Sequence, residues 1–299
     1  MKIVDAHHHL WDLGRNLYPW LRGELHDRGW GDLRPLQHNY LVRDFLADAA
    51  SQGLEKSVHV QANFDPSDPV GETAWLEEIA AEHGFPHGIV AFADFSSKNI
   101  ESVLDAHAKA SGRMRGIRQV LNRHPDPKLN RASQDYLSSE VWLGNLGLLR
   151  RYGWSFDAQA YYQQMPALAA LARRYPDLQF ILDHAGMPAE RDAAGIAGWR
   201  DGMKQLAGCP NVAVKLCGYG MVDTRWSVES IRPFVLQPIE WFGPERCMFG
   251  SNFPVDRLMA SYDRLWDAYR EITASFSTAE KDLLFRENAS RIYRLEPVQ

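Results

Sequence analysis

The chain alternates short apolar runs with longer stretches whose apolar residues recur every three or four positions. The short runs are rich in Val, Ile and Phe, which is typical of strands buried on both faces of a sheet. We expect eight such strands, at residues 2–4, 56–61, 88–95, 114–121, 154–158, 179–183, 211–216 and 247–250.

The longer stretches have the spacing of amphipathic helices. They cover residues 42–52, 70–83, 100–111, 159–174, 194–207, 228–242 and 278–293, and Gly53, Gly84, Gly112 and Gly243 fall where such helices should end. Strands that alternate with helices are parallel and joined by right-handed crossovers. The pattern predicts an α/β fold, a (β/α)8 TIM barrel in a single domain over residues 1–299. The alternative is a doubly wound open sheet, but its Gly-rich first turn is replaced here by histidines.

One long insertion follows the first predicted strand. Residues 13–40 are rich in Gly, Trp, Tyr and Pro, and loops of this length in compact domains are usually functional. In a barrel this loop would form a partial lid over the catalytic mouth, with Trp11 and Trp20 as candidate substrate contacts. Alternatively, it covers one end of the core or joins subunits.

Composition narrows the class of protein. The chain has 299 residues, 45% of them apolar, and a net charge of −5, so nothing indicates a nucleic-acid or membrane surface. Three cysteines without regular spacing favour a reducing compartment, and Cys217 and Cys247 fit core thiols. With no signal peptide and no long apolar span, we expect a cytoplasmic protein with a small-molecule substrate.

The run Asp5-Ala6-His7-His8-His9-Leu10-Trp11 carries the most specific chemistry. Side chains alternate along a strand, so His7 and His9 share one face while His8 faces the opposite side and is expected to be buried structure. Two imidazoles side by side can bind one divalent metal. A purification tag or a polar turn would also contain histidines, but a tag would be longer and would lack the flanking residues.

Polar residues stand at nearly every predicted strand end, where TIM barrels carry their active groups. They are His59, Gln61, Arg118, Gln119, Asp157, Gln159, Asp183, His184, Lys215, Ser251 and Asn252. We expect His59, Gln61, Asp157 and Lys215 to contact substrate. Lys215 could instead belong to a buried ion pair, and Asp157 could pair with a neighbouring strand.

Eight segments together resemble one family. They are DAHHHLW at 5–11, YPWL at 18–21, HVQA at 59–62, GIRQ at 116–119, FDAQ at 156–159, ILDHAG at 181–186, NVAVKLCG at 211–218 and MFGSNFP at 248–254. In this order and over nearly the full length, the chain resembles the amidohydrolase superfamily. Within it, the nearest likeness is to amidohydrolase family 2, which includes sugar-acid lactonases and 2-pyrone-4,6-dicarboxylate lactonases.

The resemblance implies a role for several residues. His7 and His9 match the pair that binds a divalent metal, with His184 as a further ligand or catalytic histidine. The metal is usually Zn²⁺, with Mn²⁺ or Fe²⁺ as alternatives, and some lactonases of this branch work without metal. Arg118 matches a residue that holds an anionic or carbonyl oxygen of the substrate.

The eighth strand departs from the family pattern. The branch commonly has Gly-Ser-Asp-Trp-Pro where this chain has Gly-Ser-Asn-Phe-Pro at 250–254. The amide of Asn252 cannot take a proton from water, although it can bind a metal or donate to an oxyanion. Three explanations are open: Asp256 supplies the base, His184 is the base, or the reaction needs no base from this strand.

The resemblance and the strand-end residues together predict a hydrolase that opens a lactone or related cyclic ester. A metal-dependent decarboxylase or oxygenase on the same fold is one alternative. A non-catalytic subunit of a paired complex is another. The aromatic insertion also makes a homodimer plausible.

Overall fold

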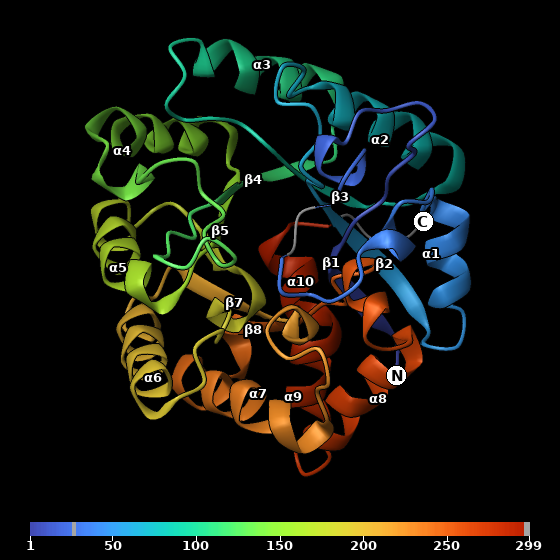
Figure 1. Cartoon of the computed structure of the whole chain (residues 1–299), viewed down its shortest axis with the longest axis vertical. Helices are drawn as coiled ribbons and strands as arrows, with labels where there is room; N and C mark the ends of the chain where they lie inside the picture. Colours follow the sequence, from blue (N-terminus) through green and yellow to red (C-terminus); the bar gives the residue numbers. More distant parts are fainter. Residues whose placement is uncertain (26–27, 296–299) are drawn as a thin grey trace.

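Eight parallel strands in sequence order form the centre of the molecule (Figure 1). The structure is a computed structural model that describes residues 1–25 and 28–295. The strands are β1 (Ile3–His8), β2 (Leu54–Val60), β3 (Gly88–Ala91), β4 (Met114–Val120), β5 (Ser155–Gln159), β6 (Phe180–Leu182), β7 (Val212–Leu216) and β8 (Cys247–Phe249).

The sheet closes between its first strand and the segment that follows its last. The amide of Asn252 donates to the carbonyl of His7 at 2.7 Å, and the amide of His9 donates to Phe253 at the same distance. The Asp5 carboxylate accepts the amide of Ser251 at 2.8 Å. These contacts confirm the single TIM barrel and exclude the open sheet.

A ring of helices surrounds the strands (Figure 1). They are α1 (Val42–Asp48), α2 (Gly71–His83), α3 (Ile100–Ala110), α4 (Glu140–Leu146), α5 (Met165–Arg174), α6 (Ala193–Ala207), α7 (Val228–Phe242), α8 (Tyr262–Ile272) and α9 (Thr278–Asp282). The short helix α10 (Asn288–Ile292) lies over the centre of the barrel instead. No helix within residues 1–25 and 28–295 is both long and apolar enough to cross a membrane.

Several predicted boundaries are wrong. Strand β1 continues through His8, because His8 pairs with His59 of β2. Strand β3 ends at Ala91 rather than at residue 95. The predicted helix at 159–174 begins only at Met165, since Gln159 is the last residue of β5. Helices α4 and α8 were not predicted, although Ser139 and Ser261 cap their first turns.

The lower interior of the barrel is apolar and is closed by the C-terminal segment. One buried cluster joins inward-facing strand residues to the end of the chain: Val4, Ala6, Val58, Val60, Val90, Ile181, Ala213, Met248, Ala289, Ile292, Tyr293 and Leu295. Tyr293 also reaches a polar layer above this cluster, where its hydroxyl donates to Asp157 Oδ2 at 2.5 Å. The C-terminal segment therefore completes both the packing and the hydrogen bonding of the interior.

Replacing Tyr293 by phenylalanine should lower the free energy of unfolding by about 1–3 kcal/mol, because the buried Asp157 carboxylate loses a donor while the ring still fills its space. Urea unfolding followed by circular dichroism measures the change. Tyr152→Phe is the matched control, since the hydroxyl of Tyr152 bonds to Asp105 on the exposed surface and should contribute below about 0.5 kcal/mol. Equal effects in the two variants would contradict the role assigned to Tyr293.

Candidate active site

Strand β1 and its continuation direct two histidines inward and one outward, as strand alternation predicts. The ring of His8 stacks on Phe45 of α1 with centroids 4.0 Å apart, and its Nε2 lies 2.9 Å from Ser57 Oγ. The ring centroids of His7 and His9 are 5.0 Å apart, and that of His7 is 4.6 Å from His184. Three imidazoles thus face one space inside the barrel mouth.

These inward histidines are neutral. Burial lowers the pKa of His7 and of His9 well below the usual range. The next cause is the charge of Lys215 for His7 and the charge of Arg118 for His9. Burial also lowers the pKa of His184, to about 3. His9 Nδ1 lies 2.6 Å from the carbonyl oxygen of Val60, so this nitrogen carries the proton. The lone pair of His9 is consequently on Nε2, which lies 3.3 Å from Asn252 Oδ1.

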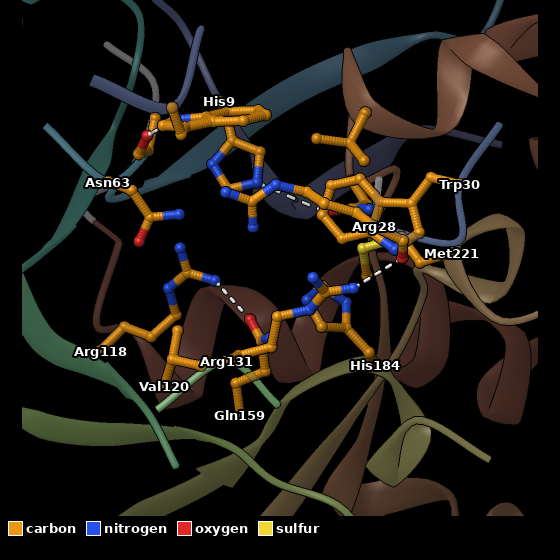
Figure 2. A pocket seen from close by; sticks show the side chains of 14 residues that line it. His9, Arg28, Trp30, Asn63, Arg118, Val120, Arg131, Gln159, His184 and Met221 are labelled. Atoms are coloured by element: carbon orange, nitrogen blue, oxygen red, sulfur yellow. Dashed lines mark hydrogen bonds between the residues drawn. The ribbon is translucent and has the colours of Figure 1, made fainter. Parts of the chain in front are cut away.

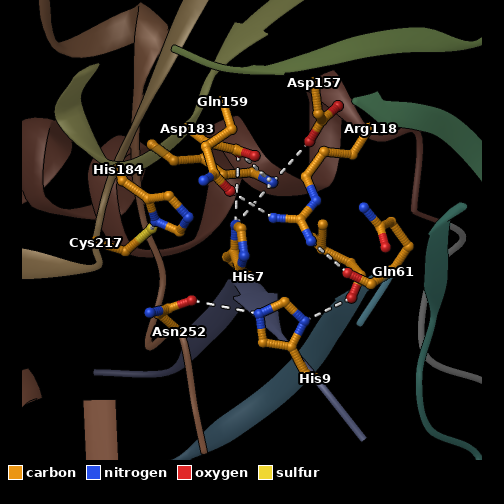
Figure 3. A network of polar contacts seen from close by, with 12 residues as sticks. His7, His9, Gln61, Arg118, Asp157, Gln159, Asp183, His184, Cys217 and Asn252 are labelled. Carbon is orange, nitrogen blue, oxygen red and sulfur yellow. Dashed lines mark hydrogen bonds and ion pairs between the residues drawn. The ribbon is translucent and has the colours of Figure 1, made fainter. Parts of the chain in front are cut away.

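A buried charge cluster holds His7 from behind (Figure 3). Lys215 Nζ lies 2.7 Å from Asp157 Oδ2, 3.2 Å from Asp183 Oδ1 and 3.3 Å from His7 Nδ1. Burial alone would lower the pKa of Lys215, but the two carboxylates outweigh it and raise that pKa, so the ammonium group stays charged. The cluster restricts the orientation of the His7 ring.

The turn after β6 presents His184 in an unusual backbone conformation. His184 and Ala185 have φ values of 57° and 49°, in the left-handed region that non-glycine residues rarely adopt. Gly218, after β7, must lack a side chain, because a Cβ there would lie 2.4 Å from His184 Nδ1. The thiol of Cys217 lies 3.4 Å from the same nitrogen.

Arg118 of β4 reaches the same space from the opposite wall. Its Nη1 donates to Gln159 Oε1 at 2.8 Å and its Nη2 donates to the carbonyl of Gln61 at 2.5 Å, whereas its Nε has no partner among the described residues. No carboxylate in the described part of the chain pairs with this buried guanidinium. A buried cation held only by neutral oxygens is suited to receive a negative oxygen from a ligand.

A pocket of about 190 Å³ opens above these groups (Figure 2). Strand ends line its floor, and the insertion and neighbouring loops line its rim. The lining residues are His9, Trp20, Arg28, Trp30, Ala62, Asn63, Arg118, Val120, Arg131, Gln159, His184, Met221, Asn252 and Val255.

Five predicted site residues line this pocket: His9, Trp20, Arg118, His184 and Asn252. His7 contacts His184 directly behind them. The structure brings together the histidines, the arginine and the amide that the strand ends suggested, and it places one aromatic residue of the insertion above them.

The other predicted site residues do not line the pocket; they are His59, Gln61, Asp157, Lys215, Trp11 and Asp256. His59 lies between Val58 and Val60, which face the interior, so its ring points outward against His8. Gln61 uses its side chain to accept the amide of Asn63. Trp11 donates to the carbonyl of His38 and packs beneath the insertion.

The charged, aromatic and thiol groups of the site that were not predicted are Arg28, Trp30, Arg131 and Cys217. The first three belong to loops, where no periodicity indicates which side chains turn inward. Cys217 lies two positions after the inward-facing Lys215, and this spacing was the available signal.

The donor atoms at this site fit a divalent transition metal. His7 Nε2 is buried without a partner in the described residues, which is costly unless a ligand binds it. One ring nitrogen each from His7 and His184 lies within 4.8 Å of Cys217 Sγ and of the other nitrogen. Neutral imidazoles and a cysteine thiolate are donors that zinc prefers, so the Cys217 thiol would lose its proton on binding.

Comparison with known proteins shows which family the chain belongs to. A family profile described as amidohydrolase matches residues 4–295. The chain belongs to the amidohydrolase family. It is 46% identical over 294 residues to an uncharacterized Sinorhizobium fredii protein, covering 98% of both chains. It is 30% identical to an L-fucono-1,5-lactonase of Burkholderia multivorans, covering 98% of this chain and 96% of that one.

A solved member of the amidohydrolase family has the same fold. The crystal structure of an amidohydrolase from Burkholderia multivorans, determined with bound zinc, superposes with a TM-score of 0.82 at 26% identity. The match covers 99% of this chain and 100% of that one. The barrel is therefore that of this family.

Asp256 lies behind Asn252 in the short turn Val255–Leu258. Its carboxylate is buried, and the polar groups nearest to it are the Asn252 side chain and the backbone of Gly218 and Gly220. Burial raises the pKa of Asp256 to about 8, so the group is mainly protonated at neutral pH and is a poor proton acceptor there.

Asp256→Asn should make stability less dependent on pH. A folded-state pKa of about 8 lies above the unfolded value of 3.8, so the wild-type contribution of Asp256 is complete below pH 3.8 and is lost as the pH rises toward 8. Urea unfolding at pH 5, 6.5 and 8 should show a smaller decline in the variant. Asp267→Asn on the exposed face of α8 is the control, and a decline equal to wild type in Asp256→Asn would refute the assignment.

Proposed function

We propose that the protein is a hydrolase that opens a lactone or related cyclic ester. The observation that carries this proposal is the group of three neutral histidines, one with an orphaned buried Nε2, facing the buried cation of Arg118. The similarity to an L-fucono-1,5-lactonase supports the same reaction class.

His7, His9 and His184 would hold a divalent ion, for which zinc is the first candidate. Such an ion would polarise the lactone carbonyl and make a water more acidic. The hydrogen bond from His9 Nδ1 to Val60 leaves Nε2 directed for this role, and the charge cluster around Lys215 orients His7.

The protein's own donors would stabilise the developing oxyanion. Arg118 has an unused Nε–H, and its guanidinium points into the pocket (Figure 2). Asn252 lines the pocket, and its side-chain amide is a group that can donate to a substrate oxygen. In this scheme position 252 binds substrate rather than removing a proton, which is the third of the explanations for the loss of the carboxylate.

The insertion would exclude bulk water from the reaction. Trp20 and Trp30 line the rim, and Trp20 is fixed by its indole N–H, which donates to the carbonyl of Ala62 at 2.7 Å. Removing water strengthens the electrostatic contacts of the charged and polar groups on the floor.

The double variant His7→Ala/His9→Ala tests the proposal. We expect near-stoichiometric metal in wild-type protein by elemental analysis, and its loss from the variant together with a fall of at least about 100-fold in lactone kcat/KM. L-fucono-1,5-lactone and carboxylate-bearing γ-lactones form the first substrate panel.

His8→Asn is the matched control, because His8 is adjacent in sequence but faces α1. It should retain metal and activity if it folds, which circular dichroism checks. Lactone hydrolysis that survives loss of His7 and His9 would contradict the proposal. Bound iron or manganese, with no lactone hydrolysed, would favour the oxygenase or decarboxylase alternative.

Arg118→Met should lower kcat/KM by about 10²- to 10³-fold, because a donor to the oxyanion is lost while the side-chain volume is kept. Arg118→Lys should restore part of this loss through its charge. Stopped assays at saturating and limiting substrate separate kcat from KM. An effect on KM alone would show that Arg118 binds substrate without acting on the transition state.

A further inference from the structure

The charged side chains that line the pocket, among the described residues, are all cationic. They are three arginines, Arg28, Arg118 and Arg131, and no aspartate or glutamate is among them. The guanidinium groups of the three arginines converge on the same space from three different segments (Figure 2). A pocket of this kind attracts an anion.

Arg28 has the most specific surroundings of the three. Its guanidinium carbon lies 5.2 Å from the ring centroid of Trp20 and 5.7 Å from that of Trp30. Within residues 1–25 and 28–295, its guanidinium donates no hydrogen bond to another residue. Burial lowers the pKa of Arg28 to about 10, and the nearby charge of Arg131 adds to this effect. The cation is thus partly desolvated and has its donors available.

A contact between two loops holds the rim of the pocket together. Arg131 donates from Nη2 to the backbone carbonyl of Arg28 at 2.7 Å, and its guanidinium lies 5.2 Å from the centroid of Trp30. This contact joins the loop after β4 to the insertion and holds Arg28 over the pocket. Arg28 is therefore placed by a bond to its backbone and by indole contacts, neither of which uses a hydrogen-bond acceptor for its guanidinium.

We infer that the substrate lactone carries a carboxylate, which Arg28 binds between Trp20 and Trp30 at the pocket rim. The lactone carbonyl then faces His9 and Arg118 on the floor. This inference rests on the proposed lactonase function and narrows it, since a simple sugar lactone such as L-fucono-1,5-lactone has no free carboxylate. The guanidinium presents parallel N–H donors that suit a carboxylate, and the flanking indoles hold the guanidinium by cation–π contact.

The test compares two substrates that differ only in charge, a carboxylate-bearing γ-lactone and its primary amide. Wild-type enzyme should prefer the acid, and Arg28→Ala should reduce the acid-to-amide ratio of kcat/KM by about 10- to 100-fold, mainly through KM for the acid. Arg34→Ala is the matched control, because Arg34 belongs to the same insertion but is exposed and paired with Asp32. An unchanged ratio in Arg28→Ala, or no preference in wild type, would overturn the inference.

A binding measurement separates this inference from the proposed function. Citrate, an unreactive tricarboxylate, should bind to wild-type protein in a calorimetric titration, at least about 10-fold more weakly to Arg28→Ala, and normally to Arg34→Ala. If no lactone is hydrolysed but citrate binding depends on Arg28, the lactonase proposal fails while the anion site stands. If lactones are hydrolysed with no dependence on charge or on Arg28, the anion site fails while the lactonase proposal stands.

Discussion

The buried ammonium of Lys215 is the interaction on which the interior depends. It lies between the carboxylates of Asp157 and Asp183, and all three side chains are fully buried. Isolated charges would be very costly there, so each is tolerated only because the others are present. Strands β5 and β7 and the turn directly after β6 supply the three charges, and β1 joins through His7. The pairing of these buried charges therefore fixes the relative positions of four strands and of His7, a candidate metal ligand.

The site combines a rigid floor with a roof made of loops. Strand ends hold His9, Arg118 and His184 through buried hydrogen bonds and packing, and this precision is what a reaction needs. The insertion and the loop after β4 supply Trp20, Arg28 and Arg131, which line the rim. In the proposed reaction the floor would carry the chemistry and the rim would select the substrate, a division that is usual in TIM barrels.

The parts of this arrangement that follow a period were predictable. Strand alternation correctly separated His8 from His7 and His9, and the repeated strand–helix pattern predicted the barrel. Alternation also places His59 on the outer face, beside the inward-facing Val58 and Val60, but strand-end position alone made it a candidate contact. The position of Arg28 in the pocket could not be predicted from the sequence. It depends on packing against indole rings and on a backbone contact from Arg131, and such contacts produce no repeating pattern of residues.

The contact between Tyr293 and Asp157 links the site to the order in which the chain is made. Tyr293 follows all eight strands in sequence, so the strands leave the ribosome before the hydroxyl that satisfies Asp157. Until then the polar layer lacks one donor and the lower opening of the barrel has no cover. The hydrogen bonding of the polar layer behind His7 can therefore be completed only after Tyr293 has been synthesised.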